Sequence, residues 1–112
     1  MKIENYSFGR ISINGKIYNS DLILFPNRIE TNWRRKKGHF LQLVDIAKII
    51  DFNPKVLIFG TGKNGFIEVS DDLIVKLNDL GISYFFDKSS KAVERYNCSE
   101  ELSKVLAIHL TC

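Results

Sequence analysis

The stretch that decides the fold class is residues 56–86, VLIFGTGKNGFIEVSDDLIVKLNDLGISYFF. Its first four residues and residues 82–86 are short apolar runs, which favours two buried strands over helices. Between them, residues 70–72, Ser-Asp-Asp, have the pattern of a helix start, and Gly81 suits the position after a helix end. A strand, a helix and a strand joined by short links predict a right-handed parallel βαβ unit.

The residues before this unit predict β structure. Asn14-Gly15 stands within the alternating residues 11–18, and both residues tolerate the positive φ of a type I′ turn, so we expect a β-hairpin there. Its second strand is expected to continue toward residues 22–25. Residues 28–34 alternate between apolar and polar side chains, which predicts another strand with one solvent-exposed face.

Three further helices are expected from apolar residues spaced three and four apart. The first covers residues 43–50 and ends at Asn53-Pro54, and the second is a short helix around residues 92–96. The third starts at residues 99–101. Its predicted inner face consists of Leu102, Val105, Leu106 and His109. The chain is therefore expected to form a layered α/β domain with a mixed β-sheet, an N-terminal β-hairpin region and a C-terminal βαβ unit followed by helices.

Length and composition restrict the class of protein further. The chain has 112 residues, of which 45% are hydrophobic and 26% charged, so we expect one ordered domain over residues 1–112. No apolar run is long enough for a membrane-spanning helix, which needs about 18 residues. The first six residues lack the apolar core of a signal peptide, and two cysteines are too few for a disulfide framework. We therefore expect a cytoplasmic location.

The net charge of +3 is unevenly distributed, with +5 in residues 1–56 and −2 in residues 57–112. Much of the positive excess lies in the five residues Trp33, Arg34, Arg35, Lys36 and Lys37. An aromatic residue beside four cations is able to stack a base and bind phosphates. A position at a strand end is more typical of a solvated sheet edge, and no RNA-binding signature accompanies the run. We therefore expect these five residues to bind a partner protein, or else an anionic membrane surface, and we expect no nucleic acid partner.

The segment Gly60-x-Gly62-x-x-Gly65 has the glycine spacing of a dinucleotide-binding loop and follows a predicted strand. In that motif the helix begins inside the loop, so that its N-terminus faces the pyrophosphate. Here residues 66–69 intervene, so we expect neither a nucleotide nor any other cofactor. Two interpretations remain: the glycines form a tight, closely packed turn, or the loop amides hold an anion or small ligand together with Thr61 and Lys63.

His109 and Cys112 are three residues apart, a spacing that is compatible with metal binding or with a thiol–imidazole pair. Two ligands are too few for a structural zinc site, so no metal site is predicted. We expect His109 to be a core histidine whose hydrogen bonds are satisfied. The acidic residues are scattered at predicted helix starts, where they favour the helix dipole, and no catalytic residue is predicted.

Several segments together resemble a known family. The resemblance rests on residues 13–18 with Asp21, Trp33-Arg34, Gly38-His39, residues 54–65, Ala92, Tyr96-Asn97 and residues 109–112. These residues look like the small, largely uncharacterised domain family that includes the adipogenesis-associated domain protein and a mitochondrial complex I assembly factor. The resemblance implies a three-layer α/β fold with a mixed central sheet, and it implies no established enzyme activity or cofactor. It also implies a pocket-lining or partner-facing role for Trp33, Arg34, His39, Thr61, Tyr96 and Asn97, in a bacterial or archaeal cytoplasmic member.

Two functions are expected from these observations. The first is a non-enzymatic protein-interaction or assembly-related domain, with another protein as its partner and an oligomeric state that the sequence leaves open. The alternative is a domain, or an unrecognised enzyme, that binds a small ligand or anion at the Gly60–Gly65 loop. The candidate ligand-binding residues are Gly60, Thr61, Gly62, Lys63, Gly65 and His39.

Overall fold

The computed structural model describes residues 1–112. Its largest sheet has five strands in the order β5-β4-β10-β7-β9. These strands are β4 (Leu22–Phe25), β5 (Arg28–Glu30), β7 (Val56–Thr61), β9 (Ser83–Asp87) and β10 (Lys104–His109). The central strand β10 is parallel to β7 and antiparallel to β4. The sheet is therefore mixed, as predicted.

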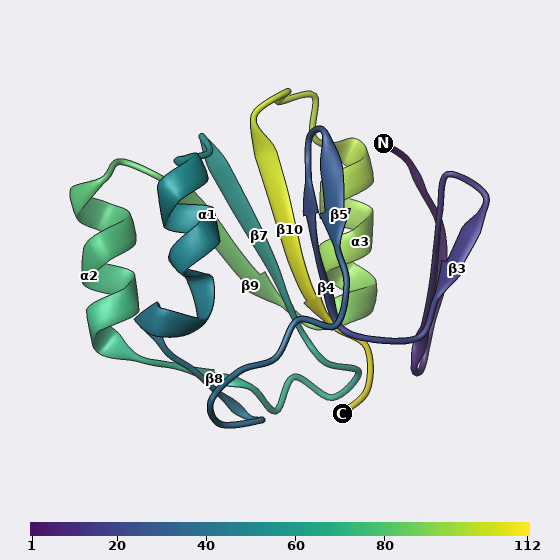
Figure 1. The fold of residues 1–112 in the computed structure, drawn as a ribbon, viewed down its shortest axis with the longest axis horizontal. Coiled ribbons are helices and arrows are strands. Elements are labelled where there is room, and N and C mark those ends of the chain that lie inside the picture. The colour runs from purple at the N-terminus through teal and green to yellow at the C-terminus, as the bar shows by residue number, and fades with distance from the viewer.

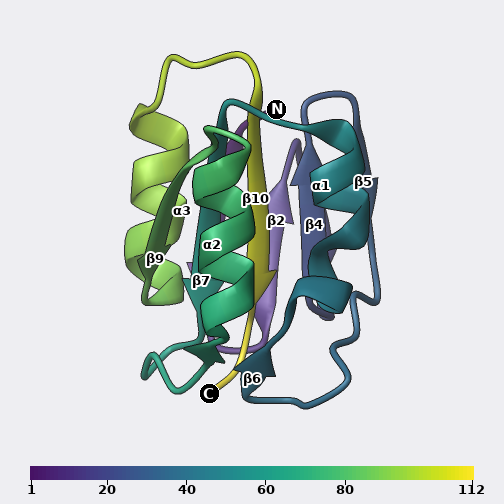
Figure 2. The same ribbon diagram turned by 90° about the vertical axis from the view of Figure 1, so that its left-hand side faces the viewer.

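Helices cover both faces of this sheet (Figures 1 and 2). A 3₁₀ turn at Leu43–Ile46 leads into α1 (Ala47–Phe52), and α1 and α2 (Asp71–Asp79) pack on one face. On the other face lies α3 (Ser89–Cys98). This arrangement gives the three-layer α/β fold with a mixed central sheet that the sequence led us to expect.

The N-terminal region forms a separate sheet that packs beside α3 (Figure 1). It consists of β1 (Ile3–Ser7), β2 (Arg10–Ile13) and β3 (Lys16–Tyr18), which pair in the order β1-β2-β3. Asn14 and Gly15 have φ values of 50° and 80°, which confirms the predicted hairpin turn. The expected continuation of the hairpin into residues 22–25 is wrong: all four of these residues are buried, and they form β4 of the central sheet.

The predicted βαβ unit is confirmed as β7, α2 and β9. The strand β7 is parallel to β9, with Val56 opposite Ser83 and Gly60 opposite Asp87. Gly81 has a φ of 71° just after α2, the conformation expected behind a helix end. The predicted strand at residues 28–34 is shorter, because β5 ends at Glu30. The chain then loops to a small parallel sheet of β6 (Phe40–Leu41) and β8 (Glu68–Val69).

The predicted last helix is wrong. Residues 104–109 form β10, the central strand of the sheet, and only α3 follows the βαβ unit as a helix. Residues Val105–His109 are all buried, because strands flank β10 on both sides and helices cover it on both faces. A strand that is buried on both faces has no polar face, so its apolar run imitates helical spacing. Leu102, expected on the inner face of the helix, is 87% exposed.

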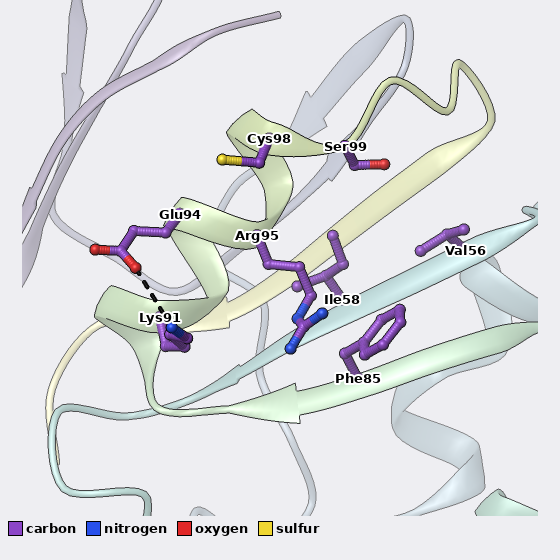
Figure 3. A pocket seen from close by; sticks show the side chains of 8 residues that line it. All are labelled: Val56, Ile58, Phe85, Lys91, Glu94, Arg95, Cys98 and Ser99. Atoms are coloured by element: carbon purple, nitrogen blue, oxygen red, sulfur yellow. Dashed lines mark ion pairs between the residues drawn. The ribbon is translucent and has the colours of Figure 1, made fainter.

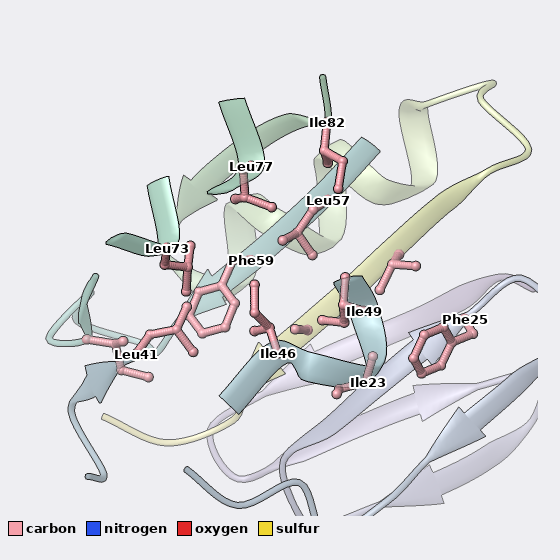
Figure 4. Packing of buried hydrophobic residues seen from close by; sticks show 13 residues of the cluster. Ile23, Phe25, Leu41, Ile46, Ile49, Leu57, Phe59, Leu73, Leu77 and Ile82 are labelled. Carbon is pink, nitrogen blue, oxygen red and sulfur yellow. The ribbon is translucent and has the colours of Figure 1, made fainter. Parts of the chain in front are cut away.

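The hydrophobic core consists of two clusters separated by the central sheet. One cluster of 13 buried residues fills the space between the sheet and the helices α1 and α2 (Figure 4). The other, of 12 buried residues, lies between the sheet, α3 and the N-terminal sheet. Alternate residues of β10 contribute to the two clusters, which makes this strand part of both.

Candidate functional site

Polar side chains gather where the parallel strands β7 and β10 end. Thr61 and His109 are the last residues of these strands and are opposite each other in the ladder. The loop of residues 62–67 follows β7, and residues 110–112 follow β10. Because β4 runs antiparallel to β10, the residue that precedes β4, Asp21, lies at the same end of the sheet.

His109 is held by Asp21. Its Nδ1 is 2.7 Å from the Asp21 Oδ2, and the amide of Leu110 donates to the Asp21 Oδ1 at 2.8 Å. His109 is 7% exposed, which confirms the prediction of a buried histidine with a hydrogen-bonding partner. The carboxylate only accepts, so Nδ1 carries the proton of this hydrogen bond, and Nε2 lies 3.4 Å from the Thr111 hydroxyl.

The ionisation of Asp21 depends on its neighbours. Burial alone would raise the pKa of the Asp21 carboxyl. Hydrogen bonds from His109 and the Leu110 amide, together with the charges of His109 and Arg35, lower the pKa below its ordinary value. Asp21 therefore stays ionised and fixes the orientation of the His109 ring.

Arg35 completes this cluster from the loop after β5. Its Nη2 is 3.0 Å from the Asp21 Oδ2, its Nε donates to the Gly38 carbonyl at 3.1 Å, and its side chain is only 5% exposed. The guanidinium lies 4.9 Å from the Trp33 ring centroid. Trp33 in turn donates from Nε1 to the Asp45 carbonyl at 3.0 Å and packs edge-on against Phe59.

The five residues expected to form a partner-binding rim therefore divide into two groups. Trp33 and Arg35 point into the protein, whereas Arg34, Lys36 and Lys37 are exposed. The cause is tertiary: the Asp45 carbonyl accepts from Trp33, and Asp21 pairs with Arg35. A polar hollow of about 350 Å³ lies beside the loop and is lined by Ser20, Asp21, Asn32, Trp33, Arg34, Arg35 and Gly38.

The glycine-rich loop uses its amides within the chain. The Gly62 amide donates to the Ser89 Oγ at 2.9 Å, the Lys63 amide to the Thr111 carbonyl at 2.7 Å, and the Gly65 amide to the Gly62 carbonyl at 3.3 Å. Gly62 has a φ of 103°, and a Cβ there would lie 2.8 Å from the Cys112 carbonyl oxygen. These contacts support the interpretation as a tight, closely packed turn. Gly60 lies within β7, and its Cβ position is similarly filled by Ile108 and Ser89.

The remaining candidate ligand residues are distributed around this turn. Thr61 donates its hydroxyl to the Asp87 carbonyl at 3.0 Å. Lys63 is exposed, and so is His39, whose ring lies 5.9 Å from that of His109 and 6.5 Å from that of Phe66. The structure thus brings His39 close to the loop. Ligand binding at these residues stays a prediction.

Tyr96 and Asn97, which the resemblance linked to a pocket or partner, lie in α3. Tyr96 is 1% exposed within the second core cluster. The Asn97 side chain accepts from the Ile3 amide at 3.2 Å and donates to the Ile3 carbonyl at 2.8 Å. Both residues hold the N-terminal sheet against α3, away from the polar cluster.

Sequence reasoning did not select Asp21 or Ser89 as site residues. Ser89 accepts from the Gly62 amide and donates to the His109 carbonyl, so it joins the ends of β7 and β10. The sequence signal for Asp21 is a single acid directly before the apolar residues 22–25. An acid at the entry to a buried strand requires a partner, and here the partners are His109 and Arg35.

A larger hollow of about 460 Å³ lies on the α3 face, beside β9 (Figure 3). Val56, Ile58 and Phe85 from the sheet form its apolar part. The remaining lining residues come from α3 and its end: Lys91, Glu94, Arg95, Cys98 and Ser99. No group of three or more histidine, cysteine, aspartate or glutamate side chains is arranged to hold a metal ion. None of the helices has the length and apolar character needed to cross a membrane.

The fold and the site define a mixed α/β domain with a polar cluster at the carboxyl ends of its parallel strands. The chain belongs to the family described as "Protein of unknown function (DUF498/DUF598)", which matches residues 3–110. The expected membership of a largely uncharacterised domain family is thereby confirmed at this level. No curated protein matches the chain significantly.

Solved structures share the fold over nearly the whole chain. A conserved hypothetical protein from Pyrococcus horikoshii is 25% identical, with 100% of both chains covered and a TM-score of 0.84. A protein from Bartonella henselae described as an outer membrane protein is 20% identical over 96% of this chain and 94% of that one, with a TM-score of 0.77. An Mth938-like domain from Bordetella pertussis is 16% identical over 97% and 85%, with a TM-score of 0.67.

Proposed function

We propose that this chain is a non-enzymatic protein-interaction domain of the assembly-factor type, and that the exposed cations Arg34, Lys36 and Lys37 contact an acidic surface of a partner protein. The observation that carries the proposal is the alternation in this loop between anchored and exposed side chains. Trp33 and Arg35 are fixed by Asp45 and Asp21, while the three cations between and after them form no ion pair within the chain.

An anchored loop is well suited to recognition. The backbone amide of Lys36 donates to the Asp45 Oδ1 at 3.0 Å, in addition to the anchors of Trp33 and Arg35. A loop that is already ordered loses less conformational entropy when it binds. Exposed charges at an interface mainly raise the association rate and select the partner. The assembly role is supported further by the resemblance to the family that includes the adipogenesis-associated domain protein and a mitochondrial complex I assembly factor.

The test reverses only the exposed charges. The variant Arg34→Glu/Lys36→Glu/Lys37→Glu leaves Arg35 in place, because reversal of a buried, paired guanidinium would destabilise the fold. A matched control reverses Lys2, Lys16 and Lys55, three exposed lysines outside the loop. Tagged proteins are used for quantitative affinity capture from the producing cells, and each captured protein is then purified and titrated by calorimetry at two salt concentrations.

We expect a partner that binds the wild type and the control directly, with weaker affinity at higher salt, and that is lost with the loop variant. Circular dichroism should show the same thermal midpoint for the loop variant and the control. A partner that binds the wild type, the loop variant and the control equally would show that Arg34, Lys36 and Lys37 do not contribute to the interface.

A second candidate function, binding of a small anionic ligand, is favoured by the positions of His39 and Lys63 beside the Gly60–Gly65 turn. Because the amides of Gly62, Lys63 and Gly65 are used within the chain, binding would depend on these two side chains. Phosphate, nucleotides and small organic acids serve as probes in titrations followed by NMR. We expect chemical-shift changes at His39 and Lys63 of the wild type on titration. The change at His39 should disappear in Lys63→Ala and persist in the control Lys76→Ala. Absence of any saturable shift contradicts this candidate.

We also propose a cytoplasmic location, which both free cysteines, Cys98 and Cys112, support. Fractionation of the producing cells tests it. Recovery in the outer membrane fraction, the location in the description of the Bartonella henselae protein, would contradict it.

A further inference from the structure

The two edges of the central sheet differ in how they are protected. At one edge, β5 has only three residues, and the charged Arg28, Glu30 and Lys48 form ion pairs over it. At the other edge, β9 has five residues with the sequence Ser-Tyr-Phe-Phe-Asp. It contains no proline and no lysine, the residues that usually prevent edge strands from pairing.

The unpaired backbone groups of β9 are identified by its ladder with β7. The Ser83 amide donates to the Lys55 carbonyl on the β7 side at 3.0 Å. Hydrogen bonding in a parallel pair alternates along the strand, so Ser83, Phe85 and Asp87 direct their backbone groups toward β7. The N–H and C=O groups of Tyr84 and Phe86 therefore point outward, to the free edge.

The groove beside this edge is partly apolar. Phe85 is 38% exposed and lines the groove from β9, and the Arg95 guanidinium lies 4.0 Å from its ring centroid (Figure 3). The rim contains both signs of charge, because Lys91 and Glu94 form a pair at 3.8 Å and Arg95 pairs with Asp87 at 2.9 Å. Because the rim carries both positive and negative side chains, it is complementary in charge to a partner surface that also carries both signs, such as the same edge of a second copy.

We propose that β9 pairs antiparallel with β9 of a second copy of this chain, so that one continuous sheet runs through a symmetric dimer. With Phe85 on the two-fold axis, Tyr84 of each copy is opposite Phe86 of the other, and the outward backbone groups of both residues are satisfied. Phe85 meets its own symmetry copy in a pair without hydrogen bonds, where side chains come closest. Ser83 is opposite Asp87 of the other copy, so a hydroxyl donor faces a carboxylate.

This register makes two opposite predictions at one exposed residue. Ser83→Asp places a carboxylate opposite Asp87 twice, once on each side of the axis, and weakens the dimer. Ser83→Lys places a cation there and strengthens it. Like and opposite charges across strands differ enough that each change should alter the dissociation constant about fivefold, in opposite directions. Ser7, an exposed serine of β1, provides the matched controls Ser7→Asp and Ser7→Lys.

Sedimentation equilibrium over about a hundredfold range of protein concentration, up to about 1 mM, measures the dissociation constant of each protein. Circular dichroism verifies that each variant is folded. Amide hydrogen exchange gives a second readout: protection of Tyr84 and Phe86 should rise with concentration, whereas that of Ser83 and Phe85 should not. A chain that stays monomeric at the highest concentration overturns the proposal, and so does a dimer that both Ser83 variants leave unchanged. A monomer that binds an extended peptide at β9 overturns it in favour of a different partner.

Discussion

Asp21 connects three segments that are distant in the sequence. Its carboxylate accepts from the Leu110 amide, bonds to His109 Nδ1 and pairs with Arg35 Nη2. The residue precedes β4, whereas its partners belong to the end of β10 and the loop after β5. A partly buried carboxylate is stable only when such partners compensate for its lost hydration. Asp21 therefore helps to fix the position of the loop of residues 33–37, together with Asp45.

The effect of pH on stability follows from the lowered pKa of Asp21. A folded-state pKa below the unfolded one means that the ionised form stabilises the fold at neutral pH. This stabilisation is complete above the ordinary aspartate pKa of about 4 and is lost as the pH falls toward the lower folded-state value. We expect Asp21→Asn to cost about 3 kcal/mol in the free energy of unfolding at pH 7, since it leaves Arg35 buried without its partner.

Urea denaturation from pH 7 to pH 3 measures the difference between wild type and Asp21→Asn, which should narrow at acidic pH. Glu4→Gln, at an exposed carboxylate, serves as a control with a small effect. A difference that stays constant over the whole pH range would show that Asp21 does not stabilise the fold through its charge.

The conformation of Gly62 gives a second prediction at the residue scale. Its φ of 103° disfavours any side chain, and a Cβ would lie 2.8 Å from the Cys112 carbonyl and 2.9 Å from the Thr111 carbonyl. We expect Gly62→Ala to destabilise the protein by about 2 kcal/mol or more, from strain and overpacking together. Gly38→Ala, where a Cβ meets nothing within 4 Å, should change stability by less than about 0.5 kcal/mol. Equal thermal midpoints for the two variants would contradict the packed-turn interpretation.

At the scale of elements, local signals decided what the sequence was able to predict. The hairpin at Asn14-Gly15 carries turn residues, and the βαβ unit carries two apolar runs and a glycine behind its helix; these features are confirmed. Ser70 stands at the predicted start of α2, but its side chain makes no capping hydrogen bond. The strand β10 carries no such signal, because its environment is made by β4, β7 and both core clusters, which are distant in sequence. Spacing within residues 102–109 alone cannot reveal that a segment is central in a sheet.

The candidate site was predictable to a similar extent. The cations of residues 33–37 are recognisable from composition, and the glycines of residues 60–65 from their spacing, so both segments were predicted as candidate binding sites. The inward direction of Arg35 and the role of Asp21 depend on the pairing of Asp21 with Arg35 and His109. These partners are distant in sequence, so no local pattern contains this pairing. Asn97 illustrates the reverse case: a residue marked by resemblance that holds two parts of the fold together.

The assignment of β10 as a strand has a test in two leucines that the helical spacing placed on one face. Leu106 is fully buried at the centre of the sheet, whereas Leu102 is 87% exposed in the preceding loop. We expect Leu106→Ala to lower the free energy of unfolding by about 3 kcal/mol, through lost burial and the cavity left behind. Leu102→Ala should change it by no more than about 0.5 kcal/mol. Guanidinium denaturation compares them, and similar losses would favour the helix over the strand.

At the scale of the whole molecule, the central strands couple the two core clusters. Val105 and Ala107 contribute to the cluster under α1 and α2, and Leu106 and Ile108 to the cluster under α3. A substitution that disrupts the packing of β10 on one face of the sheet should therefore also weaken the packing of the cluster on the other face. The N-terminal sheet belongs to this unit as well, since Ile11 is 1% exposed within the cluster under α3.

This coupling predicts that the domain unfolds in a single cooperative transition, and the single tryptophan makes the prediction measurable. Trp33 packs on the cluster under α1 and α2, so its fluorescence reports on that face, while Ile11 lies in the cluster on the opposite face. Ile11→Val should cost about 1 kcal/mol. If the two faces unfold together, this loss moves the Trp33 fluorescence midpoint in urea by the same amount as the circular dichroism midpoint, because a two-state transition is the same for every probe. Ile49→Val, on the tryptophan side, should move both midpoints similarly. A fluorescence midpoint that responds to Ile49→Val but not to Ile11→Val would mean that the N-terminal sheet and α3 unfold independently of the rest, despite the strand they share.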